Sequence, residues 1–326
     1  MKKLLATTAI VSVSFASVAL AEVTVKGSIE QTINSLSYNK AANEHKGTGS
    51  MGQETNLTVS SSGELDNGLS IKGSFRSEDG SVDHSSIKVS GDTLGFEIGA
   101  DTGSTIHTQI NPTVGDSVWF VTGAQGDDGF TTYEAHDVQH VGIDAKLGGM
   151  TAAVNYAPSN NGISAGDSNK TDAGGSATEM LLKGSIMEGV NFLIGQEKIE
   201  AANSGGSEET EKTYQVSYSA GQFALGASIR DFDDGDSTAT AGTTDEVTYL
   251  TATYAVNDQV SLGIQSVTAE SEGTGTSAAD EETLGISLGY NLGPIGVEVM
   301  YAETDNLAHS SADDVEGVQI RTVYKF

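Results

Sequence analysis

The chain has 326 residues, 40 glycines, no cysteine and a formal net charge of −29 at pH 7. Such an acidic balance argues against nucleic acid as a partner, because nucleic-acid-binding surfaces are basic, and the lack of cysteine excludes a disulfide-stapled fold. Beyond residue 21 no apolar run approaches the ~18 residues that a membrane helix needs, so a chain of this kind can cross a membrane only with strands.

Residues 1–21 predict a secretory signal peptide. They combine a basic start, an apolar stretch that ends at Leu20, and small residues just before Glu22, which is the order found in cleaved export signals. Threonine and serine residues interrupt the apolar stretch, which argues against a membrane anchor. The sequence therefore predicts a signal peptide at 1–21 and one folded unit at 22–326.

Short turns and long acidic connectors alternate along this unit. Glycine, asparagine and aspartate supply the positive φ angles of hairpin turns, and short turns of this composition lie at residues 66–68, 90–93, 147–149, 187–189, 220–222, 257–258 and 293–294. Longer polar stretches lie at about 35–54, 78–83, 102–135, 158–177, 200–211, 232–245, 270–281 and 304–314. Strict alternation of short and long connectors between sixteen strands is typical of outer-membrane barrels and not of sandwiches.

The segments between connectors alternate in polarity with a period of two, which predicts strands. In one of them, Leu94, Phe96 and Ile98 alternate with Gly95 and Glu97. The polar sets are too hydrophilic to fill a core, and sixteen strands enclose a lumen too wide for side chains to fill. We therefore expect lipid on the apolar face and water on the other, although two patterns compete around 137–145 and 245–256.

The last ten residues form the clearest strand. Val318, Ile320 and Thr322 share a face with a terminal aromatic pair, Tyr324 and Phe326. This ending resembles the closing strand of bacterial outer-membrane β-barrel proteins, in which the terminal aromatic strand is read by the assembly machinery. The resemblance implies that Tyr324 and Phe326 act as an assembly signal.

The connector at 102–135 is the longest, and it alone carries a bulky apolar run, Val118–Val121, with the single tryptophan of the chain. Loops longer than ~15 residues usually have a function or are disordered. General diffusion porins have sixteen strands and fold their third long loop into the lumen, and this connector is the third. By its topology, its signal peptide and its Val323–Phe326 ending, the chain resembles the Gram-negative general porins, of the alphaproteobacterial type.

The resemblance implies an all-β, transmembrane antiparallel barrel of about 16 strands in the outer membrane of a Gram-negative bacterium. Its lumen, narrowed by loop 102–135, would pass small hydrophilic solutes and ions by passive diffusion, and its outer surface would contact lipid and lipopolysaccharide. A homotrimer is also implied, although the stretch at 78–83, which in enteric porins latches onto a neighbouring subunit, is short here.

The implied mechanism is a field across the narrowest point of the pore. Acidic residues of the loop would face basic residues of the wall, and we expect closure of the barrel to bring Lys26 and Arg321 beside the basic residues of the third and fourth strands. Such charges set ion preference, and because lumen acids outnumber bases we predict a weak cation preference. The acidic set is Asp116, Asp127, Asp128 and Glu134; the basic set is Lys26, Lys72, Arg76, Lys88 and Arg321. Each of them could equally be an ordinary solvated lumen residue.

Other functions find less support in the sequence. No nucleophile, base and orienting group occur in a catalytic pattern, so we expect no enzyme and no cofactor. The acidic loops could bind divalent cations weakly, although a solvated loop is the simpler interpretation. The alternatives are a secreted or surface-attached acidic β protein of the adhesin type and a barrel that serves as a non-conducting anchor.

Overall fold

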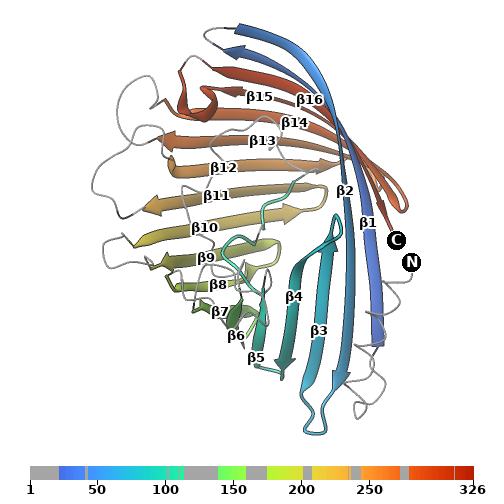
Figure 1. Ribbon diagram of the computed structural model, residues 1–326, viewed down its shortest axis with the longest axis vertical. Helices are drawn as coiled ribbons and strands as arrows, with labels where there is room; N and C mark the ends of the chain where they lie inside the picture. Colours follow the sequence, from blue (N-terminus) through green and yellow to red (C-terminus); the bar gives the residue numbers. More distant parts are fainter. Residues whose placement is uncertain are drawn as a thin grey trace.

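The computed structural model describes residues 22–40, 43–100, 103–108, 110–113, 139–158, 175–200, 208–233, 235, 244–271, 279–311 and 313–326. In these residues the chain forms sixteen antiparallel strands that close into a barrel (Figure 1), which confirms the predicted fold class. Residues 1–21 lie outside the described part, so the signal peptide stays a prediction. No helix in the described residues has the length and apolar character needed to span a membrane.

The strands follow one another around the barrel in chain order. They are β1 (Glu22–Lys40), β2 (Asn43–Glu64), β3 (Ser70–Glu78), β4 (Ser81–Ser90), β5 (Leu94–Ala100), β6 (His140–Leu147), β7 (Met150–Ala157), β8 (Ala177–Met187), β9 (Val190–Ile199), β10 (Glu209–Ala220), β11 (Phe223–Asp233), β12 (Thr244–Ala255), β13 (Val260–Ser271), β14 (Glu281–Leu292), β15 (Ile295–Asp305) and β16 (Asp314–Lys325). A short 3-10 turn, η2 (Leu307–His309), lies between β15 and β16.

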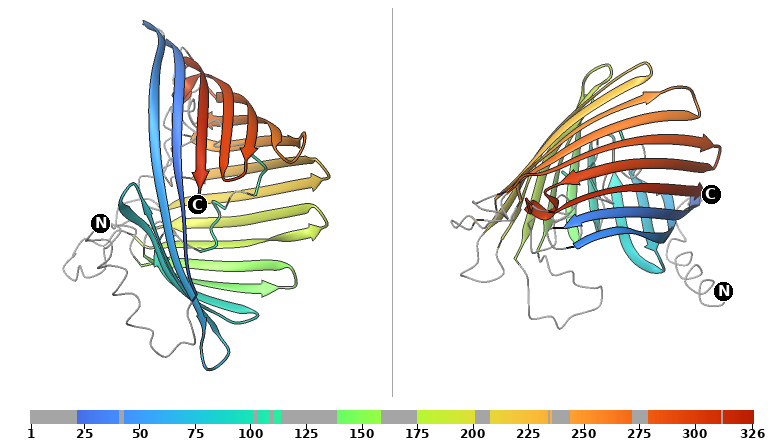
Figure 2. Two further views of the ribbon diagram at one scale, coloured as in Figure 1. Left: turned by 90° about the vertical axis from the view of Figure 1, so that its right-hand side faces the viewer. Right: turned by 90° about the horizontal axis from the view of Figure 1, so that it is seen from above.

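The barrel closes where β1 pairs with β16 (Figure 2). In this pair Ile33 stands opposite Ile320. Every strand thus has a partner on both sides. Closure removes the unpaired backbone edges that lipid cannot solvate.

The two faces of the sheet differ in polarity as the sequence predicts. On β5, Leu94, Phe96 and Ile98 are 62%, 44% and 50% exposed, whereas Glu97, between Phe96 and Ile98, is 7% exposed. A segment that crosses the interior of the barrel (Figure 1) is hydrogen-bonded to Gln215 of the polar set. The polar set therefore forms the inner face, and the apolar set forms the outer face toward lipid.

Two connectors differ from the prediction. Residues 35–54, expected as a long loop, are mostly strand, because β1 and β2 continue to Lys40 and from Asn43. In this region β1 pairs through its backbone with β2 on one side and with β16 on the other. Such pairing does not require apolar side chains where the strands extend beyond the bilayer. Residues 78–83 contain only a tight turn at Asp79 and Gly80, both with positive φ.

One part of the inner face is apolar, contrary to the expectation of a uniformly polar lining. Val247, Tyr249, Val267 and Met300 belong to a buried cluster formed by inner positions near the loop ends of β11–β16. The sequence left open which residues of β12 face inward. The structure settles this, because Val247 and Tyr249 point inward and Leu250 points outward. The alternation was ambiguous at 245–256 because both faces carry apolar residues.

The assignment of the outer face predicts a position-dependent effect of charge. Ile286, near the middle of β14, is 53% exposed on the outer face. Ile286→Lys should destabilise the barrel in lipid vesicles by about 2–4 kcal/mol, the cost of a lysine near the bilayer midplane. The neighbouring substitution Ser287→Lys, on the inner face, should change the stability of the barrel by no more than about 0.5 kcal/mol. Urea titration, with heat-modifiable migration as the sign of folded protein, measures the stability of both variants. Equal losses of stability in the two variants would contradict the assignment of Ile286 to the outer face.

Candidate functional site

The first part of the long third connector lies against the inner face of the barrel. Residues 103–108 and 110–113, called the strap from here on, cross the inner side of strands β7–β11 (Figure 1). Residues 114–138 lie outside the described part of the chain, so the inward fold of the whole loop stays a prediction.

Side-chain amides of the wall hold the backbone of the strap. Asn155 Nδ2 on β7 donates to the carbonyl of Ser104 at 2.8 Å. Gln215 Nε2 on β10 donates to the carbonyls of Ile106 and Thr108 at 3.3 and 3.0 Å, and its Oε1 accepts from the backbone N–H of Ile110 at 3.2 Å. An amide that both donates and accepts fixes the depth and the register of the segment that it binds.

Small wall residues make room for the strap. Ile106 is fully buried with Ala153 and Leu181, and a side chain at Gly195 would collide with it. At Gly226 an added Cβ would meet the side chains of Asn111 and Pro112. The wall therefore has a shape complementary to the strap at two points, on β9 and on β11.

Three glutamates form a row across the wall beneath the strap. Glu179 on β8 stands opposite Glu197 on β9, and Glu197 stands opposite Glu211 on β10. All three are fully buried. Like charges directly opposite one another repel, so this arrangement needs positive groups or hydrogen-bond donors around it.

The strap and β11 supply such groups. Arg230 on β11 donates to both carboxylate oxygens of Glu211, at 2.8 and 3.1 Å. Its Nη2 also lies 3.0 Å from His107 Nδ1. Thr105 Oγ1 donates to Glu179 at 3.0 Å, as does Asn155 Nδ2. The strap thus contributes a hydroxyl and an imidazole to the glutamate row.

The predicted basic residues all lie on inner-face positions, but they form separate groups. Lys72 and Lys88 stand opposite each other on β3 and β4. Lys88 forms ion pairs with Asp144 and, at 3.6 Å, with Glu97. Its charge is therefore partly balanced by the wall itself.

Arg321 lies apart from Lys26. The β1–β16 register places Arg321 opposite Thr32, six residues along β1 from Lys26, which corresponds to roughly 20 Å. Arg321 forms an ion pair with Glu30 at 2.5 Å. Lys26 is instead separated from Arg76 only by Thr58 of the intervening strand, and Arg76 lies 3.8 Å from Glu78.

The predicted acidic set, Asp116, Asp127, Asp128 and Glu134, lies outside the described residues, so its role stays a prediction. In the described residues, the predicted bases Lys88, Arg76 and Arg321 pair with acids of the strands. Arg230 and His107, which were not predicted, lie at the glutamate row. Each glutamate of the row follows the alternation of its own strand and could have been placed on the inner face. Their mutual register, and the approach of His107, depend on pairings that one sequence does not reveal.

Comparison with known proteins identifies the family. The sequence profile described as "Gram-negative porin" matches residues 6–309. The chain belongs to this porin family. Among curated protein sequences none is significantly similar to the chain.

Solved porin structures share the fold of this porin. OprB of Pseudomonas putida superposes with a TM-score of 0.68 at 10% identity, over 94% of each chain. An anion-selective porin from Comamonas acidovorans superposes with a TM-score of 0.67 at 15% identity, over 94% of this chain and 100% of that one. OmpT, an outer membrane protein of Vibrio cholerae, gives 0.61 at 16% identity over 95% and 100%.

Family and fold together make this chain an outer-membrane porin of a Gram-negative bacterium and not an enzyme. At these identities the likeness to the solved structures concerns the barrel alone. The solutes and the charge preference of this porin depend on its own lining.

Proposed function

We propose that this porin lets small hydrophilic solutes and ions diffuse passively through a water-filled lumen that loop 102–135 narrows. The observation that carries this proposal is the seating of the strap on the inner face, where Gln215 binds three backbone groups of the strap and Ile106 is buried. This attachment of the start of the loop to the inner wall supports the proposal that loop 102–135 narrows the lumen.

We further propose that fixed charges of the wall and the loop set the ion preference. Lys26, Lys72 and Arg76 occupy inner positions of β1–β3, whereas the glutamate row occupies β8–β10. The loop residues Asp116, Asp127, Asp128 and Glu134 add negative charge, and residues 101–139 contain neither lysine nor arginine. Acidic charge therefore dominates the lumen, which favours a weak preference for cations.

A homotrimer is the proposed assembly, with one part of the outer face as its contact surface. Gln31 and Gln53 are opposite each other on β1 and β2 and face outward between the apolar residues Ile29 and Ile33. Amide side chains lose hydrogen bonds in hydrocarbon. Contact with a second copy of this face would cover them.

Planar-bilayer recording of the mature protein tests the proposed function. We expect open channels whose reversal potential in a salt gradient shows a weak cation preference, and trimers should close in three equal steps. A graded sugar series should reveal a size limit for solutes. A sealed barrel would indicate an anchor, and a clear anion preference would contradict the charge assignment.

A further inference from the structure

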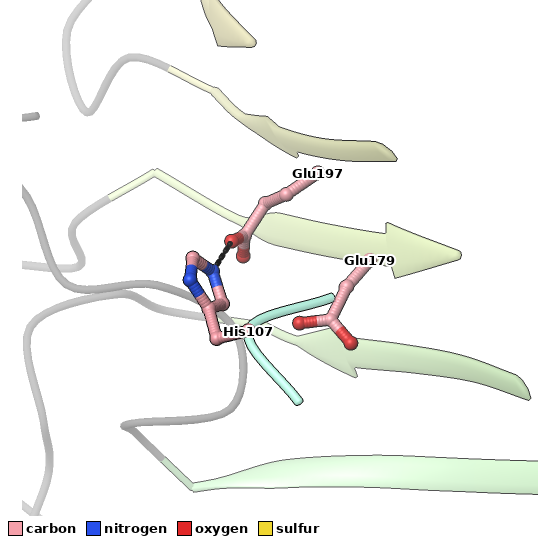
Figure 3. Close-up of side chains that lie close together, drawn as sticks. All are labelled: His107, Glu179 and Glu197. Atoms are coloured by element: carbon pink, nitrogen blue, oxygen red, sulfur yellow. Dashed lines mark ion pairs between the residues drawn. The ribbon is translucent and has the colours of Figure 1, made fainter. Parts of the chain in front are cut away.

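The strap brings an imidazole to the glutamate row in an arrangement that suits a metal ion. His107 points from the strap toward Glu197, with Glu179 beside it on the neighbouring strand (Figure 3). One ligand atom from each residue lies within 4.8 Å of the others. We propose that His107, Glu179 and Glu197 form a binding site for one divalent transition-metal ion that clamps the strap to the wall.

The distances are close to those of a metal site. His107 Nε2 lies 3.8 Å from Glu197 Oε2. Ligand atoms around a tetrahedral zinc ion are about 3.4 Å apart when the bonds are about 2.0–2.2 Å. Movements of a few tenths of an ångström would therefore bring the imidazole and the Glu197 carboxylate to one ion, whereas Glu179, whose ligand atom lies within 4.8 Å of the other two, would need to move by up to about 1.4 Å. Three protein ligands leave the fourth position to water.

The surroundings of the ligands support the same assignment. Both oxygens of Glu179 accept hydrogen bonds, from Asn155 and from Thr105, and such outer partners orient a ligating carboxylate. Glu179 and Glu197 are fully buried, unlike the acids of a solvated loop. The imidazole makes zinc, cobalt, nickel or copper the expected class, because magnesium and calcium prefer oxygen ligands.

Arg230 should weaken metal binding at this site. A guanidinium only donates hydrogen bonds, so its contact with His107 Nδ1 places the ring proton on Nε2, the atom that would bind the ion. Metal binding at Nε2 requires the proton to move to Nδ1 and the Nη2 of Arg230 to turn to Glu211 alone, which it already contacts at 3.1 Å. Arg230 would thereby limit the affinity of the site.

Cobalt binding to the full mature protein in detergent, without a polyhistidine tag, tests the site. We expect one Co²⁺ per chain with a visible d–d spectrum, and displacement by Zn²⁺. His107→Ala and Glu197→Gln should each lower the affinity at least tenfold. Arg230→Gln should raise it, since the amide oxygen can accept from Nδ1–H. Heat-modifiable migration establishes that each variant is folded.

His84→Ala is the matched control, because His84 also lies on the inner face, on β4, where its Nε2 is 3.2 Å from Ser74 Oγ. It should bind Co²⁺ like the wild type. Absence of a stoichiometric Co²⁺ spectrum in the wild type, or unchanged binding in His107→Ala, would overturn the proposal. Because the spectrum does not require conductance, a non-conducting barrel that binds Co²⁺ would refute the diffusion function and leave the metal site standing.

Discussion

Ile106→Asp should widen the pore. Ile106 is fully buried between Ala153 and Leu181 and lies against Gly195, so the substitution removes an apolar contact worth about 2–5 kcal/mol. It also buries a carboxylate, which costs several kcal/mol more when it has no positive partner. A loss of about 3 kcal/mol already shifts the ratio of docked to undocked strap by a factor of more than 100.

The barrel itself should remain intact, because Ile106 belongs to no strand and the strand pairs are unchanged. We therefore expect a higher single-channel conductance and passage of larger sugars, with normal heat-modifiable migration. The loop should also become more sensitive to chymotrypsin, for which Trp119 and Phe120 are cleavage sites.

Thr113→Asp is the control, since Thr113 is an exposed residue of the same strap and gains the same charge. Its conductance should stay close to that of the wild type. If Ile106→Asp conducts like Thr113→Asp, the seating of the strap does not determine the width of the pore.

The sequence was sufficient for the parts of this fold that repeat. Alternation of residues such as Leu284 and Ile286 with Gly285 and Ser287 follows from a sheet with lipid on one side. The seven short turns predicted from glycine, asparagine and aspartate all lie between neighbouring strands. The prediction was wrong at residues 35–54, where strand pairing continues through polar sequence. Composition cannot distinguish a polar loop from a polar strand, because the pairing uses the backbone.

The lumen was predicted less well than the wall, because its contacts join segments that are distant in the chain. The contact between Gln215 and the strap spans more than a hundred residues. Because β1 pairs with β16, Lys26 and Arg321 were both expected beside the basic residues of β3 and β4. The register, which alternation alone does not fix, places Arg321 beside Glu30 instead.

Gly27→Val should weaken closure of the barrel. Phe326 pairs with Gly27 through two backbone hydrogen bonds, of 2.9 and 3.0 Å, and its ring occupies the space that a side chain at Gly27 would fill. Tyr324 lies next to it, with ring centroids 5.8 Å apart. A valine at position 27 must displace the ring, and overpacking of this kind costs about 1–3 kcal/mol, which lowers the folding equilibrium constant about 5- to 150-fold.

This substitution separates two roles of the terminal residue. Deletion of Phe326 removes both the ring contact and the proposed assembly signal, whereas Gly27→Val leaves the chain end unchanged. If Phe326 stabilises the closed barrel, both variants should refold poorly into lipid vesicles in the absence of any assembly machinery. Gly73→Val is the matched control, because a Cβ at Gly73 comes no closer than 3.9 Å to another atom. If Gly27→Val refolds as completely as Gly73→Val, Phe326 does not stabilise the closed barrel, and recognition by the assembly machinery is the role that is left for it.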